Sequence, residues 1–451
     1  MKVQRFEVAG LAQYSYVVSS EGKAVVVDAI RDIDRYLAYA ANEKLEITHV
    51  LETHIHADFV AGSVALAEAT GASLALSGHD KGEHYHYTMP HRALFDAEEI
   101  VVGAARIRAL HTPGHTPEHL SFLLSDAGET KALLSGDFLF AGGLGRPDLL
   151  GDEAKVGLAR ELYRSLHERI ATLPDEVKVY PGHGAGSLCG AGIGDHAETT
   201  LGDERAMNPL FRLEEEAFVE AILASVPEMP DYYPRMKVLN ARGADVLKKI
   251  PGDRALTAVE VAELLEDEDA VAIDLRSPEA FAQGHIPGAI SLGAEGNLSL
   301  WAGWILDAGK RLLLVGAGSD EEESRLGLIR VGLDRIEGYL AGGMEAWILA
   351  GREIARVKTY SVDEVEYRDD ATLLLDVRNA REWDDSHIEG ARRIALGELT
   401  RSLDLLPRDR PIVTICGSGY RASVAASLLE RGGFRDVGWM VGGMEAWERK
   451  K

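Results

Sequence analysis

The sequence Thr53-His54-Ile55-His56-Ala57-Asp58 decides how the first half of this chain is interpreted. It follows the apolar run of residues 47–51, which is typical of a buried strand, and it precedes small residues that favour a helix from about position 60. A strand that ends in His-x-His-x-Asp brings two imidazoles and a carboxylate into one loop, where they can converge on a metal ion. Two loop histidines alone also fit an ordinary polar surface, so the other motifs of the chain are needed to decide.

Three further apolar runs of the first half end in turns that carry a histidine or an aspartate. Residues 106–110 lead into His111-Thr112-Pro113-Gly114-His115, residues 131–135 into Gly136-Asp137, and residues 177–180 into Pro181-Gly182-His183. Loops at strand ends are where a rigid scaffold presents catalytic groups. The sequence therefore predicts an α/β domain over residues 1–245, with four loops that meet at one candidate metal site.

Length and composition set the general class of protein. A chain of 451 residues is too long for one core and indicates two to four domains. The net charge of -25 argues against nucleic acid or an anionic membrane as partner. No apolar run approaches the roughly 18 residues that span a bilayer, and residues 1–10 lack the pattern of a secretion signal, so we expect a cytoplasmic protein. With only Cys189 and Cys416, a disulfide framework is excluded.

The four motifs, in this order along the chain, resemble the metallo-β-lactamase superfamily. The resemblance implies an αββα sandwich with metal ligands at one edge. Binuclear hydrolases of this superfamily, such as glyoxalase II, have a histidine directly after the aspartate, where this chain has Phe59. Because a phenyl ring cannot bind a metal, a second site built from Asp58, position 59 and His183 loses a nitrogen ligand.

The persulfide dioxygenase branch of the superfamily is similar in using a single non-haem iron. This resemblance implies that His54, His115 and Asp137 hold one Fe(II) per chain, with zinc as the alternative metal. It leaves His56, Asp58 and His183 as alternate ligands or as groups behind the ligands. Two imidazoles and one carboxylate leave positions open for O2 and an anionic substrate.

Further matches to that branch are Gly-Arg-Pro-Asp at 145–148, Glu-Arg at 204–205 and Asn-Pro at 208–209. Arg146 is expected either to steer an anionic substrate or to form a structural ion pair with a carboxylate such as Asp148. Cys189 follows His183 in a glycine-flanked segment. A cysteine in this place would receive sulfur or gate the substrate; inert packing is the alternative.

The second half contains an internal repeat of about a hundred residues, which indicates tandem domains. The Asp-Leu-Arg of residues 274–276 returns as Asp-Val-Arg at 376–378, and Gly-Gly-Met-Glu-Ala-Trp of residues 342–347 recurs unchanged at 442–447. Each copy, over residues 255–352 and 358–451, resembles a rhodanese domain. The resemblance implies two small α/β domains with parallel sheets.

The last copy carries a cysteine where rhodanese chemistry takes place. The apolar run 411–415 ends in Cys416-Gly417-Ser418-Gly419-Tyr420-Arg421, before a helix from about position 422. Glycines let successive N–H groups point inward, while the helix N-terminus and Arg421 add positive potential. Such a cradle is expected to lower the thiol pKa and to hold a persulfide anion. Cys416 and Arg421 are therefore the candidate catalytic pair, and residues 417–420 are the candidate substrate-binding loop.

The middle copy has Gly316 in place of that cysteine, followed by four acidic residues at 320–323 that would repel a persulfide or thiosulfate. We expect this copy to be catalytically inactive, and to serve as a spacer or a docking module.

As a whole, the chain resembles a bacterial fusion of a persulfide dioxygenase with two rhodanese domains. The resemblance implies an enzyme of hydrogen sulfide detoxification that oxidises a small-molecule thiol persulfide, of the glutathione or coenzyme A type, to sulfite with O2. Cys416 would transfer sulfur, giving or consuming thiosulfate. One alternative is a zinc-dependent thioester hydrolase fused to a sulfurtransferase. Another is a non-catalytic metal domain that delivers partners to the sulfurtransferase. Because members of this family often self-associate, a homo-oligomer is also expected.

Overall fold

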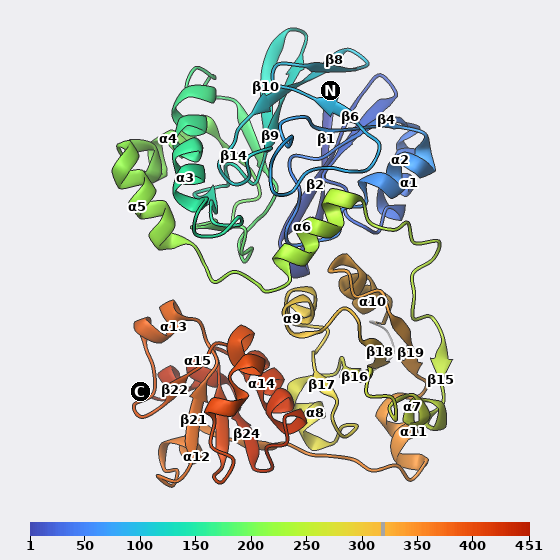
Figure 1. The fold of residues 1–451 in the computed structure, drawn as a ribbon, viewed down its shortest axis with the longest axis vertical. Helices are drawn as coiled ribbons and strands as arrows, with labels where there is room; N and C mark the ends of the chain where they lie inside the picture. The colour runs from blue at the N-terminus through green and yellow to red at the C-terminus, as the bar shows by residue number, and fades with distance from the viewer. Residues whose placement is uncertain (317–320) are drawn as a thin grey trace. The chain divides into compact units, whose positions relative to one another are not determined.

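The computed structural model describes residues 1–316 and 321–451. The chain divides into two compact units, Met1–Lys248 and Lys249–Lys451 (Figure 1). Among the described residues, none of the helices combines the length and the apolar character that a bilayer crossing requires.

The first unit contains two six-stranded sheets. The first sheet consists, in spatial order, of β1 (Lys2–Val8), β2 (Gln13–Ser20), β3 (Lys23–Val27), β4 (Glu46–Leu51), β5 (Ser73–Ser77) and β6 (Arg92–Leu94). The second consists of β14 (Thr199–Thr200), β12 (Lys178–Pro181), β10 (Glu129–Gly136), β9 (Leu120–Asp126), β8 (Ala105–His111) and β7 (Glu99–Val102). A short ribbon of β11 (Leu144–Gly145) and β13 (Gly190–Ala191) lies apart from both sheets.

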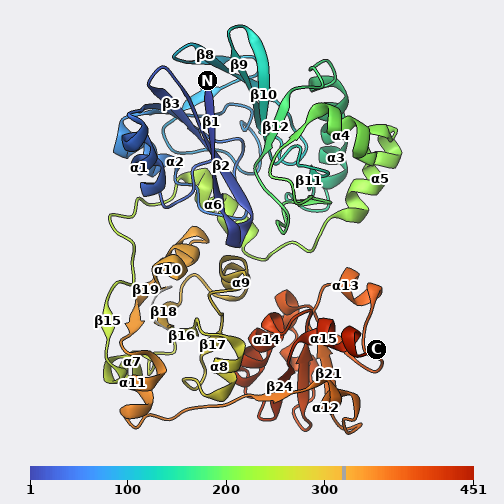
Figure 2. The same ribbon diagram turned by 180° about the vertical axis from the view of Figure 1, so that it is seen from behind.

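The two sheets pack face to face, because alternate strand residues are apolar and buried. Val25 and Leu51 of the first sheet share one core with Phe122 and Leu134 of the second. Helices α3 (Lys155–Arg164) and α5 (Glu215–Ser225) cover the other face of the second sheet, and α2 (Ser63–Thr70) packs on β4 and β5 of the first. Helix α1 (Asp34–Glu43) lies beside α2 (Figures 1 and 2). This arrangement is the expected helix–sheet–sheet–helix sandwich.

The ends of β4, β8, β10 and β12 deliver the four motif loops to one edge of this sandwich. β10 and β12 run parallel, so that Gly136 pairs with Pro181 and the loops after these strands lie side by side. Helix α6 (Tyr233–Arg242), from the end of the unit, packs against the loop that follows β4 through several side-chain hydrogen bonds. The site is thus built from segments far apart in the sequence.

The second unit contains two five-stranded sheets with the same strand order, in which all the described pairings are parallel. One consists of β15 (Ala255–Leu256), β19 (Ile336–Leu340), β18 (Arg311–Val315), β16 (Ala270–Asp274) and β17 (Ile290–Ser291). The other consists of β20 (Lys358–Tyr360), β24 (Val437–Met440), β23 (Ile412–Ile415), β21 (Leu373–Asp376) and β22 (Arg392–Arg393). The α/β class and the parallel sheets expected from the sequence repeat are confirmed.

Helices connect these strands in both copies. They are α7 (Ala258–Leu264), α8 (Pro278–Gln283), α9 (Leu298–Ile305), α10 (Glu321–Arg330) and α11 (Gly343–Leu349) in the middle copy, and α12 (Val362–Glu366), α13 (Ala380–Asp385), α14 (Tyr420–Arg431) and α15 (Gly443–Lys450) in the last. Helix α4 (Leu201–Met207) belongs to the first unit.

Strand register shows which positions of the two copies correspond. Asp274 pairs with Val315 in the middle copy, and Asp376 pairs with Ile415 in the last. The next residues, Gly316 and Cys416, are therefore equivalent. Residues 317–320, which follow Gly316 and include the first of the four acidic residues, lie outside the described residues.

Within this second unit, helix α14 of the last copy packs on the middle copy. Ser423 Oγ lies 2.9 Å from Ser291 Oγ, and the Glu430 carboxylate lies 2.9 Å from Nε2 of His285. The ring of Tyr420, the first residue of α14, covers Gly296 so closely that a Cβ there would come within 2.2 Å of it. The middle copy thus supports the helix that directly follows the Cys416 loop.

Candidate metal centre and sulfur-carrier loop

His54, His115 and Asp137 converge from three different loops. Their donor atoms lie within 4.8 Å of one another, and Oδ2 of Asp137 is 3.8 Å from His54 Nε2 and 3.6 Å from His115 Nε2. All three atoms are buried, and none has a hydrogen-bond partner. Because buried polar atoms almost always have partners, three unpartnered donors around one point indicate a metal site.

Neighbouring groups fix both imidazoles in the form that binds a metal. His115 Nδ1 donates to the carbonyl of Arg146 (2.9 Å), which leaves the lone pair of Nε2 free. The Thr53 hydroxyl donates to Asp28 (3.0 Å), so its oxygen accepts from His54 Nδ1 (2.9 Å). Burial and neighbouring imidazoles hold the pKa of His54 and of His115 well below its usual range, so both rings stay neutral.

The Asp28 carboxylate holds the His-x-His loop in place by hydrogen bonds. It follows β3 with a left-handed φ of 57°, and its carboxylate accepts from the Thr53 backbone N–H (2.7 Å) and from His56 Nε2 (3.1 Å). Burial lowers the pKa of His56, but Asp28 outweighs it, and the pKa is raised overall. His56 Nδ1 is buried without a partner, yet it is not part of the converging group of donors. His56 therefore lies beside the centre, bonded to Asp28.

A second group of donors, Asp58, His183 and Cys189, also lies within 4.8 Å. Both ring nitrogens of His183 are already bonded to carboxylates, Nδ1 to Asp137 and Nε2 to Asp58, each at 2.8 Å. Because ionised carboxylates only accept, this arrangement favours the doubly protonated ring. Burial lowers its pKa, but the two carboxylates outweigh it and hold the pKa well above its usual range. In this state His183 offers no lone pair to a second metal.

Phe59 and Cys189 complete the surroundings of this second group. Phe59 is fully buried, with its ring centroid 4.3 Å from that of His56. The thiol of Cys189 is buried 3.9 Å from the Tyr233 hydroxyl. Burial, with Asp58 and Asp137 nearby, raises the pKa of Cys189 well above its usual range, so the sulfur is a thiol and not a thiolate.

Arg146 forms the ion pair that the sequence left as one of two interpretations. Its guanidinium bonds to both carboxylate oxygens of Asp148 (2.7 and 2.8 Å) and to the carbonyls of Leu188 and Pro227 (3.0 and 2.8 Å). The side chain is buried, and protein groups occupy its donors. Its backbone carbonyl orients His115. The Glu204 carboxylate, from another of the matching segments, accepts the Gly142 N–H in a neighbouring loop.

Helix α6 holds the His-x-His-x-Asp loop by its backbone, a feature that sequence analysis missed. Asn240 donates to the carbonyls of His56 (2.8 Å) and Phe59 (2.7 Å) and accepts from the Ala61 N–H (2.9 Å). Tyr232 and Lys237 donate to the carbonyls of Asp58 (3.0 Å) and Ile55 (2.8 Å). One signal was available, because polar residues occupy the stripe of this helix that should be apolar: Tyr233, Lys237 and Asn240.

The Cys416 thiol is buried at the end of β23, and its Sγ accepts a hydrogen bond from the Gly419 N–H (3.1 Å). Gly419 has a φ of 118°, which favours glycine. Arg421, expected beside the sulfur, forms a two-point ion pair with Glu382 (2.6 and 2.7 Å). Burial lowers the pKa of Arg421, but Glu382 and then Cys416 outweigh it.

The repeated Gly-Gly-Met-Glu segment holds this loop from the other side. The backbone N–H groups of Met444 and Glu445 donate to the carbonyls of Cys416 (2.8 Å) and Gly417 (3.0 Å). These two hydrogen bonds hold the loop in the conformation in which the Gly419 N–H points towards the sulfur.

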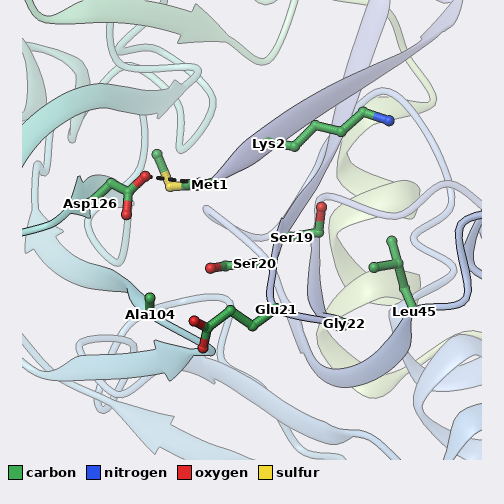
Figure 3. Close-up of a pocket in the computed structure, with 9 residues that line it drawn as sticks. All are labelled: Met1, Lys2, Ser19, Ser20, Glu21, Gly22, Leu45, Ala104 and Asp126. Atoms are coloured by element: carbon green, nitrogen blue, oxygen red, sulfur yellow. Dashed lines mark hydrogen bonds and ion pairs between the residues drawn. The ribbon is translucent and has the colours of Figure 1, made fainter.

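A surface hollow at the amino-terminal edge of the first unit contains none of the metal donors (Figure 3). Ser20, Glu21 and Ala104 line it, and the terminal ammonium of Met1 pairs with Asp126 at 2.8 Å. This hollow is separate from the metal chemistry.

Comparison with known proteins identifies the family. Residues 8–183 match the model of the Metallo-beta-lactamase superfamily, and residues 257–350 and 361–450 each match that of the Rhodanese-like domain. A Hydroxyacylglutathione hydrolase of Polaromonas sp. is 32% identical over 243 residues, which are 48% of this chain and 88% of that protein. The chain belongs to the metallo-β-lactamase superfamily.

Two other relatives of this metallo-β-lactamase superfamily member extend the comparison. The crystal structure of a Metallo-beta-lactamase from Staphylococcus aureus subsp. aureus COL has a TM-score of 0.68 and 34% identity, covering 75% of this chain and 98% of that one. Persulfide dioxygenase ETHE1, mitochondrial, of Bos taurus is 28% identical over 212 residues, 46% of this chain and 75% of that protein. The chain is therefore a metallo-β-lactamase domain fused to two rhodanese-like domains, with a metal site of His and Asp ligands.

Proposed function

We propose that this protein oxidises the terminal sulfur of a small-molecule thiol persulfide to sulfite with O2, at one Fe(II) held by His54, His115 and Asp137. The observation that supports this most directly is the set of three unpartnered buried donors, two imidazole nitrogens and one carboxylate oxygen. Fe(II) in such a set keeps open positions and supplies O2 activation.

The residues around this set favour one metal over two. Phe59 contributes no ligand, and His183 is bonded through both nitrogens to Asp58 and Asp137. The chain's own groups prepare the site: Asp28 and Thr53 orient His54, His183 holds one oxygen of Asp137, and helix α6 holds the loop backbone. In this proposal Cys189, whose thiol lies with Asp58 and His183 in the neighbouring group of donors, receives sulfur or gates the substrate.

The proposal comprises two reactions, one at the metal and one at Cys416, and each of them balances. R-S-SH, O2 and water give R-SH, sulfite and two protons. At the second site the Cys416 thiolate attacks the terminal sulfur of R-S-SH; the S–S bond of the donor breaks, R-SH leaves, and a cysteine persulfide anion remains. Sulfite then attacks the outer sulfur of this anion, which releases thiosulfate and restores the thiolate. The reverse direction consumes thiosulfate. The Gly419 N–H and the α14 N-terminus stabilise the sulfur anion in either direction.

The test is oxygen uptake by iron-loaded protein with glutathione persulfide or coenzyme A persulfide, with sulfite and thiosulfate quantified and metal counted per chain. We expect stoichiometric uptake that His115→Ala abolishes and that His196→Ala, at an exposed histidine, leaves intact. Cys416→Ser should stop thiosulfate chemistry while oxygen uptake continues. Loss of both activities in Cys416→Ser would defeat this division of labour.

A zinc-dependent thioester hydrolase is the second candidate, because the Hydroxyacylglutathione hydrolase of Polaromonas sp. shares 32% identity over 243 residues with this chain. It would require His183 and Cys189 of the second donor group to lose protons to solvent, so that a second metal could bind there with Asp58. Two zinc ions per chain, hydrolysis of a hydroxyacyl thioester of glutathione and no oxygen uptake would establish this reaction instead.

A further inference from the structure

Lys237 is a buried cation at the metal centre for which the proposed reaction has so far given no role. Its side chain on α6 is only 2% exposed, and Nζ donates to the Ile55 carbonyl (2.8 Å), between the two histidines of His-x-His. The ammonium also lies 5.3 Å from the centroid of the Tyr85 ring. Within the part of the chain that the structure describes, no carboxylate forms an ion pair with it. Buried charges are normally paired. Burial lowers the pKa of Lys237, and the nearby negative charges, of which Glu118 has the largest effect, oppose this without forming an ion pair with it.

Arg146, another buried cation near the centre, is neutralised by a carboxylate, as buried cations usually are. It is 1% exposed, and Asp148 neutralises it through two hydrogen bonds while the carbonyls of Leu188 and Pro227 accept two more. Lys237 uses one of the three donors of an ammonium for Ile55. Two N–H groups of Lys237 therefore remain for a ligand.

The charges around the centre favour an anion as that ligand. The Lys237 ammonium places a positive charge beside the His-x-His loop, and a divalent metal held by the three donors would add to it. The buried carboxylates nearby already have other partners: Glu118 accepts from the Ile55 N–H, and Asp28 accepts from Thr53 and His56.

We infer, building on the metal centre proposed above, that the Lys237 ammonium and the metal together form a binding site for a small anion, the deprotonated terminal sulfur of the persulfide. Persulfides ionise more readily than thiols, so the substrate reaches the site as the anion. Lys237 selects the ionised substrate and holds its charge beside the metal, while Arg146 keeps a structural role.

The test uses Co(II)-loaded protein and follows ligand binding by visible absorption, without turnover. Azide is the anionic probe and imidazole the neutral one. We expect Lys237→Gln to raise the Kd of azide about tenfold, a loss of about 1.4 kcal/mol, and to leave that of imidazole unchanged. Lys237→Arg, which retains the charge, should stay within about threefold of the wild type for both probes.

The variants separate charge from helix packing. The glutamine amide can still donate to the Ile55 carbonyl, and Lys237→Met provides a second uncharged side chain. Asn240→Ala removes hydrogen bonds between α6 and the loop but keeps the ammonium, so its ratio of azide to imidazole affinity should match the wild type. Equal azide affinity in Lys237→Gln and wild type, at one metal per chain and equal melting temperature, would overturn the inference. Azide selectivity without any oxygen uptake would instead refute the proposed reaction and leave the anion site standing.

Discussion

The repeated Gly-Gly-Met-Glu-Ala-Trp segments offer a matched pair of substitutions with different expected costs. Gly443 and Gly343 both have left-handed backbones, with φ of 55° and 56°. A Cβ on Gly443 would lie 2.3 Å from the Cys416 carbonyl oxygen and 2.4 Å from that of Gly417, whereas on Gly343 the nearest atom is the Gly316 oxygen at 3.0 Å. Alanine in this conformation costs about 1–2 kcal/mol, which is what we expect for Gly343→Ala.

Gly443→Ala must in addition push the sulfur-carrier loop aside, which costs a further 1–3 kcal/mol or so. The movement would shift Cys416 relative to the Gly419 N–H that its sulfur accepts from. Sulfur transfer from thiosulfate to cyanide, followed by the thiocyanate formed, should therefore fall at least about tenfold in Gly443→Ala and remain close to wild type in Gly343→Ala. Calorimetry gives the accompanying stability loss. Wild-type transfer in Gly443→Ala, with a melting temperature equal to that of Gly343→Ala, would refute this account of the glycine.

Three further outcomes follow from other contacts. Thr53→Val removes the hydroxyl that orients His54, so metal affinity should fall about 10–100-fold in competition with a chelator; an unchanged affinity would contradict the role of Thr53. Asn240→Leu leaves two buried carbonyls and one N–H unpaired, and should destabilise the first unit by about 3 kcal/mol or more, lowering its calorimetric transition but not that of the second unit. Burial lowers the pKa of His111, so the unfolded chain binds a proton at this imidazole more readily than the folded chain, and stability should fall as the pH drops below about 6.5. His111→Gln should make the decrease in melting temperature between pH 7.5 and 5.5 smaller. An equally large decrease in the variant would contradict this role of His111.

The fold and the centre of the metal site could be predicted because their signals are local. Each of His54, His115 and Asp137 directly follows an apolar strand in its own short motif, and strands of one sandwich bring such loops to one edge. The absence of a cysteine from the middle copy could also be predicted, since the repeat aligns Gly316 with Cys416 and the strand register agrees.

The residues of α6 that hold the His-x-His-x-Asp loop could not be predicted, because they contact segments far away in the sequence. Lys237 and Asn240 reach loop carbonyls 182 and 184 positions earlier in the chain, and no local pattern states which backbone a buried side chain will meet. Arg146 shows a different limit. Both of its interpretations fitted the sequence, and only burial and the distances to Asp148 separate them.

The packing of Tyr420 on Gly296 has a consequence for how this chain can change over time. A duplicated module that has lost its nucleophile would ordinarily be free to drift, because no reaction depends on it. Here the surviving module depends on the shape of the lost one, since any side chain at position 296 would collide with the residue that follows the sulfur loop. In the last module expressed alone, the Tyr420 ring would lose its contact with Gly296 and face water. Separating the two modules would therefore also break the contacts of helix α14 with Ser291 and His285.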